Sequence, residues 1–278
     1  MIDGETKVHC LYGYPVGHSM SPIIFNNTFE KMNVNRIYLP FPVKPEHLKD
    51  AVEAARTLDF AGFNITMPHK TRIVELLDDL DNTTREIGSV NTVSTGPRGL
   101  VGHNTDGEGA SRAIRAHGFN TESRRVVVLG AGGAARSIVR TLAHEADITV
   151  LSRDLKEAAK VADLARGKGR VSSGKLSKSS FEESVKTADL LLDATPVQTV
   201  SLIRNLNSST STLPPGLSVF DLAYDQPLEA LPIGIKRISA LEMLAQQAAL
   251  SYEIWMNKPA PLELMRSVLV EHVGGDWK

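Results

Sequence analysis

Three basic side chains stand together in Asn64-Ile65-Thr66-Met67-Pro68-His69-Lys70-Thr71-Arg72, where a β-rich run gives way to a stretch of helical character. The dipole of a helix disfavours cations in its first turn, by roughly 0.3–1 kcal/mol each. We therefore expect a helix over 71–79 and a lowered pKa for Lys70, which suits a residue that exchanges protons with a substrate. The alternative is an exposed lysine on a poorly optimised helix.

A second set of polar residues comes just before predicted helices. Asp106 precedes an amphipathic stretch and serves either as a catalytic acid or, more simply, as a helix N-cap. Ser19 and Ser21 lie in Gly17-His18-Ser19-Met20-Ser21-Pro22, where two hydroxyls near a helix N-terminus suit a carboxylate ligand. Ser21 followed by proline also predicts an N-cap.

Gln247 is the polar member of an otherwise apolar helical stripe with Met243, Leu250 and Ile254. It either faces a ligand cavity or makes a buried hydrogen bond to the backbone. The neighbouring stripe of Glu242, Gln246 and Glu253 is polar throughout, and we expect it to face solvent.

A glycine-rich loop follows the apolar run that ends at Leu129 and opens a helix. Its pattern is G-x-G-x-x-A, and in this context the pattern indicates dinucleotide binding. The first glycine allows a tight turn, the second lets the backbone approach a pyrophosphate, and the helix N-terminus supplies N–H donors. A tight turn that binds nothing is the alternative. The residues that we expect to contact the cofactor here are Gly130, Ala131, Gly132, Gly133 and Ala134.

The end of the next predicted strand reads Leu151-Ser152-Arg153-Asp154. An NAD site usually has an acidic residue there, whereas the hydroxyl of Ser152 and the guanidinium of Arg153 suit a 2′-phosphate. NADP is therefore favoured, with NAD still open because of Asp154. The alternative for Asp154 is the N-cap of the following helix.

Two modules must position these residues. Residues 8–105 alternate short β-rich runs with helical stretches, which indicates an α/β domain. From Arg125 a βαβ succession predicts a mainly parallel sheet. Helices at Ala240–Met256 and Pro261–Val273 close the chain, and the Ser/Lys-rich piece 172–180 is expected to be an exposed loop.

Composition narrows the class of function. With 278 residues, 31 Lys and Arg, and 32 Asp and Glu, the formal charge is −1, which argues against nucleic acid or an anionic membrane as a partner. The polar start and the lack of a long apolar run predict neither a secretion signal nor a membrane span. One cysteine, Cys10, and no metal-ligand spacing favour a reducing compartment, by default the cytoplasm, and no metal.

Several segments together resemble the shikimate dehydrogenase family, over nearly the whole chain. His18-Ser19-Met20-Ser21-Pro22 resembles its H-S-x-S-P, Asn64 to Lys70 its N-V-T-x-P-H-K, and Gly88-Ser89-Val90-Asn91-Thr92 its G-A-x-N-T. Asn104-Thr105-Asp106-Gly107 matches N-T-D-G. The glycine loop, Asp221-Leu222-Ala223-Tyr224 and Met243-Leu244-Ala245-Gln246-Gln247 complete the match.

The resemblance implies reversible, NADP-dependent reduction of 3-dehydroshikimate to shikimate on the route to aromatic amino acids. It implies Lys70 and Asp106 as the catalytic pair. Ser19 and Ser21 would hold the substrate carboxylate, and the further substrate contacts would be Thr66, Asn91, Tyr224 and Gln247. Thr195 joins the cofactor residues.

The family's architecture is an N-terminal α/β substrate domain, here residues 1–105 plus 240–278, and a doubly wound Rossmann-type dinucleotide-binding domain, here 106–239. The active site would be the cleft between them, in a monomer or homodimer. The chain departs from the family pattern at Asp154, Asp193, Ala240 and Glu242. An NAD-linked quinate/shikimate dehydrogenase and a non-catalytic dinucleotide sensor are therefore the rival hypotheses.

Overall fold

The computed structural model describes residues 2–223 and 230–274. Its contacts divide the chain into two compact units. Unit 1 comprises the residues up to Gly109 and those from Leu244 onward, and unit 2 comprises Ala110–Met243. No described helix is long and apolar enough to cross a membrane.

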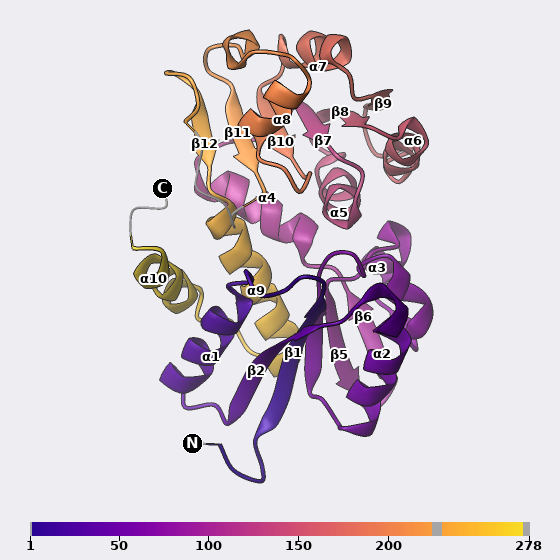
Figure 1. The fold of residues 1–278 in the computed structure, drawn as a ribbon, viewed down its shortest axis with the longest axis vertical. Coiled ribbons are helices and arrows are strands. Elements are labelled where there is room, and N and C mark those ends of the chain that lie inside the picture. Colours follow the sequence, from indigo (N-terminus) through magenta and orange to yellow (C-terminus); the bar gives the residue numbers. More distant parts are fainter. Residues whose placement is uncertain (1, 224–229, 275–278) are drawn as a thin grey trace. The chain divides into compact units, whose positions relative to one another are not determined.

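Unit 1 is built on a mixed sheet in the order β2-β1-β3-β5-β6-β4. Figure 1 labels four of its strands, β1, β2, β5 and β6. β1 pairs in parallel with β2 and β3, while β5 is antiparallel to β3 and β6. The strands are β1 (Lys7–Gly13), β2 (Arg36–Pro42), β3 (Gly62–Ile65), β4 (Asp79–Leu80), β5 (Thr92–Gly96) and β6 (Gly99–His103). The helices are α1 (Ser21–Lys31), α2 (Leu48–Thr57), α3 (Asn82–Ile87), the start of α4 (Asp106–Ala116), most of α9 (Ala240–Met256) and α10 (Leu262–Val273).

Two apolar layers hold this sheet. One is a cluster to which α2 contributes Leu48 and Val52 and the strands contribute Phe63 and Val93. The other is aromatic, and in it Phe25 of α1 stacks on Tyr38 at a ring-centroid distance of 4.6 Å. Trp255 of α9 joins the second layer and donates its indole N–H to Val93 O at 2.9 Å. This fixes α9 against the sheet whose ends carry the polar site.

Unit 2 contains a wholly parallel sheet in the order β12-β11-β10-β7-β8-β9. The chain reverses its direction of winding between β7 and β10, as in doubly wound α/β sheets that bind dinucleotides. The strands are β7 (Arg125–Leu129), β8 (Asp147–Ser152), β9 (Val171–Lys175), β10 (Leu190–Asp193), β11 (Ser218–Asp221) and β12 (Lys236–Ile238). The helices are the rest of α4, α5 (Gly133–Leu142), α6 (Leu155–Asp163), α7 (Lys178–Val185), α8 (Thr199–Asn205) and the start of α9.

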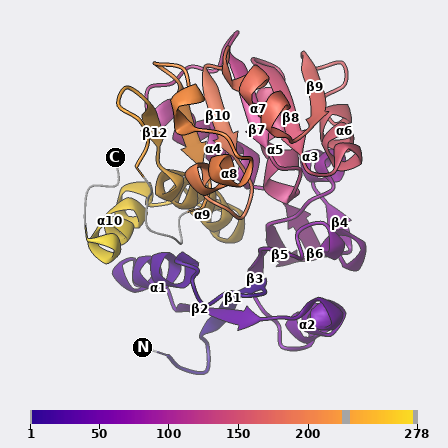
Figure 2. The ribbon, with the colours of Figure 1, turned by 45° about the horizontal axis from the view of Figure 1, so that its top comes forward.

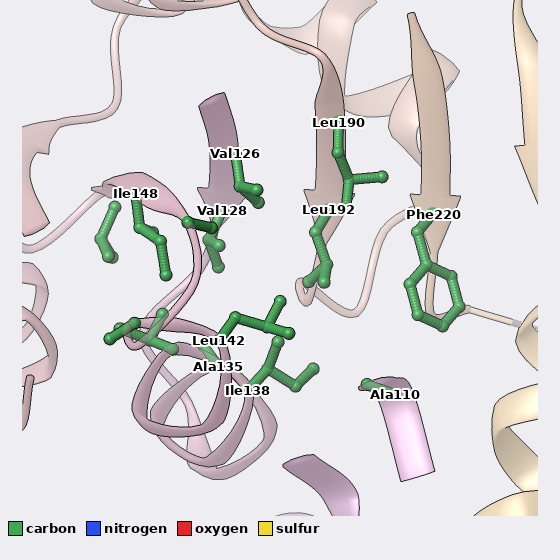
Figure 3. Packing of buried hydrophobic residues seen from close by; sticks show 14 of the residues in the cluster. Ala110, Val126, Val128, Ala135, Ile138, Leu142, Ile148, Leu190, Leu192 and Phe220 are labelled. Carbon is green, nitrogen blue, oxygen red and sulfur yellow. The ribbon is translucent and has the colours of Figure 1, made fainter. Parts of the chain in front are cut away.

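Helices cover both faces of this sheet. On one face, Ile138 and Leu142 of α5 pack on Val126, Val128 and Leu192 (Figure 3). On the other face, α7 and α8 supply Phe181 and Ile203 to a second cluster. Figure 2 shows α6 beside the edge strand β9. Burial on both faces explains the unbroken apolar run at Val126–Leu129. The predicted α/β class with a doubly wound domain is confirmed.

Two local predictions are wrong. Residues 71–79 do not form an α-helix, because only Arg72–Leu76 is helical, as a short 3₁₀ segment. β-branched Thr71, Ile73 and Val74 weaken the helical preference there. The expected exposed loop 172–180 instead contributes β9 and the start of α7, where Ser177 and Ser180 form a reciprocal capping box. An edge strand tolerates such a polar sequence.

One prediction about a helix N-cap and one about an exposed helix face are also corrected. Ser21 is the first residue of α1 rather than its cap, and Met20 takes the N-cap position without a side-chain cap. Glu242 and Gln246 are buried, so their stripe does not face solvent. The reason is that α9 is covered on most of its circumference, a situation that periodicity along the sequence does not reveal.

Candidate active site

Lys70 and Asp106 form an ion pair in unit 1. The Lys70 Nζ donates to Asp106 Oδ2 at 2.7 Å. The lysine side chain is 20% exposed and the aspartate side chain 5%, so the lysine is partly accessible to a ligand while the carboxylate is buried. Backbone contacts fix both ends: Val90 N donates to Lys70 O at 2.7 Å, and Asp106 N donates to Asn104 Oδ1 at 3.0 Å. A cation held in this way can deliver a proton or a hydrogen bond to a substrate oxygen.

Lys70 does not stand at the start of an α-helix. Because the expected α-helix does not form over 71–79, there is no helix dipole to act on the ammonium. The electrostatic partner of Lys70 is instead the Asp106 carboxylate, 36 residues further along the chain. Asp106 is also not an N-cap, since it is the first residue of α4.

Asn91 and Gln247 lie beside this pair. The Asn91 amide nitrogen is 3.0 Å from Asp106 Oδ1, 2.8 Å from Thr105 Oγ1 and 3.5 Å from Gln247 Oε1. Gln247 is half-buried and donates to Leu244 O at 3.1 Å. The structure thus brings together four of the predicted site residues. Of the two alternatives for Gln247, the structure shows the hydrogen bond to the backbone, and the side-chain oxygen lies 3.5 Å from the Asn91 amide nitrogen.

Sequence reasoning missed the residues whose hydrogen bonds hold the backbone of Asn91. Asn64 donates to Asn91 O at 3.0 Å and to Ser251 Oγ at 3.1 Å, and it accepts from the Tyr38 hydroxyl at 2.8 Å. Ser251 in turn donates to Gln247 O at 3.0 Å. The available signal was Asn64 itself, an amide within the fully buried strand Gly62–Ile65.

The loop that carries Ser19 and Ser21 lies next to Thr66. Ser19 N donates to Val16 O, and Ser19 Oγ accepts from Ser21 N at 3.3 Å. Gly13 has both the Thr66 methyl and Val16 so close to its Cα that a β-carbon would not fit. Thr66 and the loop that carries the two serines are therefore neighbours around Gly13. The predicted substrate contact Tyr224 lies outside the described residues.

The glycine loop of unit 2 has the geometry that a dinucleotide needs. Gly130 adopts a φ of +100°, a conformation that favours glycine, and its N–H donates to Leu151 O at 2.8 Å. Gly132 is the N-cap of α5, and a β-carbon there would meet no atom within 4 Å. Ala135 is fully buried against the sheet. The open space at Gly132 and the N–H groups of the first turn of α5 fit a pyrophosphate.

After β8, Asp154 could serve either as a ribose-binding residue or as a helix N-cap. Asp154 is the N-cap of α6 and accepts from the Lys156 and Glu157 amides at 2.8 and 3.4 Å. Its carboxylate thus has a structural role, while Ser152 and the exposed Arg153 precede it. Thr195 follows β10 and donates its hydroxyl to Val197 O at 2.9 Å.

No group of three or more His, Cys, Asp or Glu side chains within residues 2–223 and 230–274 is arranged to hold a metal ion. The Lys70–Asp106 pair of unit 1 can support proton transfer to or from a substrate oxygen.

Comparison with known proteins decides the family. Residues 11–93 match the model of the shikimate dehydrogenase substrate binding domain, 241–270 that of the shikimate 5′-dehydrogenase C-terminal domain, and 118–202 a putative NAD(P)-binding domain. The shikimate dehydrogenase (NADP⁺) of Alkaliphilus metalliredigens is 36% identical over 97% of this chain and 98% of its own length. The chain belongs to the shikimate dehydrogenase family. The predicted resemblance is confirmed.

Solved structures of this family share the fold. A crystal structure of shikimate dehydrogenase in complex with NADP⁺ is 30% identical, with a TM-score of 0.84 and 98% of both chains covered. Shikimate 5-dehydrogenase from Listeria monocytogenes, in complex with shikimate and NAD, is 29% identical, with a TM-score of 0.84. It covers 96% of this chain and 98% of its own.

Proposed function

We propose that this chain catalyses the reversible, NADP-dependent reduction of 3-dehydroshikimate to shikimate, a step in aromatic amino acid biosynthesis. The observation that carries the proposal is the Lys70–Asp106 pair at 2.7 Å, in a chain that belongs to the shikimate dehydrogenase family. The relative from Alkaliphilus metalliredigens is named as NADP⁺-dependent, and the glycine loop supports the same cofactor class.

Lys70 is the proposed acid and base. When bound, NADPH supplies a hydride to the ketone carbon, and negative charge then develops on the ketone oxygen. The Lys70 ammonium donates a proton or hydrogen bond to that oxygen, and Asp106 holds the ammonium in place. In the reverse direction Lys70 accepts the hydroxyl proton.

The remaining polar residues orient the substrate in this proposal. Asn91 and Gln247 lie next to the ion pair and contact ring hydroxyls, while Thr66, Ser19 and Ser21 bind the opposite, carboxylate end. Hydroxyls can donate to a carboxylate without introducing a second charge. Tyr224 belongs to the same proposal on the resemblance alone. Residues 1–105 and 240–278 then form the substrate domain, and 106–239 the cofactor domain.

NADP is the proposed cofactor in preference to NAD. Gly130, Ala131, Gly132, Gly133 and Ala134 would hold the pyrophosphate, and Thr195 follows the neighbouring strand. Arg153 and Ser152 would bind the 2′-phosphate. Support comes from Asp154, the acidic residue that would favour NAD. Its carboxylate accepts the capping hydrogen bonds of α6. We further propose a cytoplasmic monomer or homodimer with small-molecule partners only.

The decisive experiment measures initial rates of shikimate oxidation at alkaline pH with NADP⁺ and NAD⁺ separately, with quinate in parallel. Lys70→Ala is the test variant, and Lys49→Ala, an exposed lysine of the same unit, is its control. We expect rapid NADP⁺-linked shikimate turnover that falls by about 10²–10⁴-fold in Lys70→Ala alone. Dominant NAD⁺-linked quinate turnover would favour the quinate-type enzyme, and NADP⁺ binding without turnover would favour a sensor.

A further inference from the structure

Two buried aspartates end adjacent strands of unit 2. Asp193 closes β10 and Asp221 closes β11, and the two residues are directly paired in the sheet register. Asp193 is fully buried and Asp221 is 4% exposed. Neither residue is used by the proposed reaction. Two carboxyl groups side by side in a buried setting cannot both carry a charge without a large electrostatic cost.

Their hydrogen bonds differ. Asp221 accepts from Thr199 N at 2.7 Å and from Ala223 N at 3.0 Å, one bond on each oxygen. Asp193 accepts from Thr195 N at 2.9 Å through Oδ1 only. Its buried Oδ2 has no hydrogen bond of good geometry, and neither does the buried hydroxyl of its neighbour Thr199. Asp221 is thus solvated as an anion by backbone donors, whereas Asp193 suits the neutral acid, with a proton on Oδ2.

The position of Asp193 couples it to the nucleotide edge. It is paired with Leu129 at the end of β7, and β7 and β10 are the strands between which the order of the sheet reverses. In such sheets ligands bind at the carboxyl ends of these two strands. Ala194 O also lies so close to Gly130 that a β-carbon there would be 3.1 Å from it. A negative charge on Asp193 would thus oppose a pyrophosphate.

We propose that Asp193 is a positioning residue that works as an uncharged carboxylic acid, and that its ionisation loosens the turn 194–198 and weakens dinucleotide binding. This inference rests on the proposed function in so far as it names the dinucleotide. The contact through which Asp193 holds the turn is the hydrogen bond that its Oδ1 accepts from Thr195 N at 2.9 Å.

The electrostatic surroundings agree with this role. Burial raises the pKa of Asp193 to about 7, the charge of Asp221 adds to the effect, and the contacts with Thr195 and Thr199 oppose it. Burial also raises the pKa of Asp221, against the bonds from Thr199 and Ala223 and the charge of Arg237 on β12. The groups that face Asp193 from β7 and the glycine loop, Leu129 and Gly130, do not titrate.

The direction in which stability changes with pH follows from the coupling between folding and proton binding at Asp193. The pKa of Asp193 is higher in the folded chain than its ordinary value of 3.8, so the folded state holds a proton that the unfolded state has lost. The stabilisation is fully present below about pH 4 and is lost as pH rises through about 7. If an anionic cofactor favours neutral Asp193, binding takes up a proton above pH 7. The dissociation constant then rises by up to about tenfold per pH unit.

The test compares the full-length wild type with Asp193→Asn, which has nearly the same shape but cannot ionise, between pH 5.5 and 9. Asp189→Asn is the control, because Asp189 precedes the same strand and pairs with Arg124 at the surface. Titration with NADP⁺ gives dissociation constants, and thermal unfolding without cofactor gives stabilities. Comparison between variants cancels the ionisation of the 2′-phosphate of NADP⁺ itself.

We expect the wild type to lose NADP⁺ affinity and thermal stability relative to Asp193→Asn as pH rises, and Asp189→Asn to follow the wild type. Parallel profiles for wild type and Asp193→Asn would overturn the inference. If NADP⁺ binds to neither protein, the proposed function fails, and the cofactor-free unfolding profiles still decide the protonation state of Asp193.

Should Asp193→Asn not fold, the infrared band of a protonated carboxyl group in ¹³C-aspartate-labelled wild type takes the place of the comparison between variants. Its absence at pH 6 would contradict a neutral Asp193.

Discussion

The side-chain amide of Asn91 donates to Asp106 Oδ1 at 3.0 Å, while Lys70 donates to Oδ2 of the same carboxylate at 2.7 Å. Both oxygens of Asp106 are therefore engaged, by groups on two different segments. A carboxylate held in this way cannot rotate freely, so it fixes the direction from which the lysine reaches a ligand.

Replacing Asp106 with Asn should lower kcat by about 10²–10³-fold with a smaller change in KM, because the ammonium loses its charged partner and its orientation. Steady-state kinetics of shikimate oxidation would measure both parameters. Asp79→Asn, which alters a carboxylate paired with the exposed Arg85 and Arg98, is the control and should keep wild-type rates. Equal losses in the two variants would mean that general destabilisation, not Lys70 orientation, is responsible.

Replacing Gly132 with Ala should weaken NADP⁺ binding tenfold or more while leaving the melting temperature nearly unchanged. The added methyl meets no protein atom within 4 Å, so it occupies only the space that we assign to the pyrophosphate. Gly130→Ala is the contrasting variant. It should lose stability as well, because Gly130 has a φ of +100° and lies against Ala194. Unchanged NADP⁺ affinity in Gly132→Ala would argue against this location for the cofactor.

Replacing Arg153 with Ala should reduce NADP⁺ affinity about 10–100-fold with little effect on NAD⁺, because only NADP⁺ carries the 2′-phosphate. Fluorescence titration with each cofactor measures the ratio. Arg170→Ala removes another exposed arginine of unit 2 and serves as the control. A parallel loss for both cofactors would assign Arg153 to another part of the nucleotide.

Asp154→Ala, by contrast, should lower the free energy of unfolding by about 1 kcal/mol through loss of the α6 cap. Chemical denaturation measures this effect, and the NADP⁺ to NAD⁺ preference should stay as in the wild type. A large shift toward or away from NAD⁺ would show that the carboxylate contacts the ribose after all.

Replacing Gly109 with Ala should destabilise the protein by roughly 1–3 kcal/mol, because a β-carbon there would lie 3.0 Å from Gln247 Cβ and 3.1 Å from Gln247 N. Displacement of Gln247 should also raise the KM for shikimate. Denaturation and kinetics together test this pair of effects. Gly96→Ala, where a β-carbon meets open space, should change neither quantity.

The sequence predicted features that depend on local pattern. The α9 helix has the predicted bounds Ala240–Met256, and the strand and glycine loop from Arg125 have the geometry that the motif requires. The predictions from sequence failed where residues far apart in the chain determine the local structure or the burial of a side chain. Lys70 was noticed for a helix that does not exist, and Glu242 was expected to face solvent although it is buried.

The supporting network around Asn91 was beyond pattern reasoning for the same reason. Asn64 and Ser251 are separated by 187 positions, and nothing in either local sequence points to the other. Their contact depends on how α9 packs against the sheet, where Trp255 donates to Val93 O and Ser251 Oγ lies 2.8 Å from Thr92 Oγ1. Polar residues inside buried strands are therefore the signal to look for, even when their partners cannot be named.

Cys10 gives the protein a practical property. It is the one cysteine among the 278 residues, it is fully buried in β1, and burial raises the pKa of its thiol, so it will react slowly with thiol reagents. A cysteine introduced on the surface would consequently be labelled selectively without removing the natural one. Spectroscopic probes can thus be attached at single chosen sites, one variant at a time, in an otherwise unaltered chain.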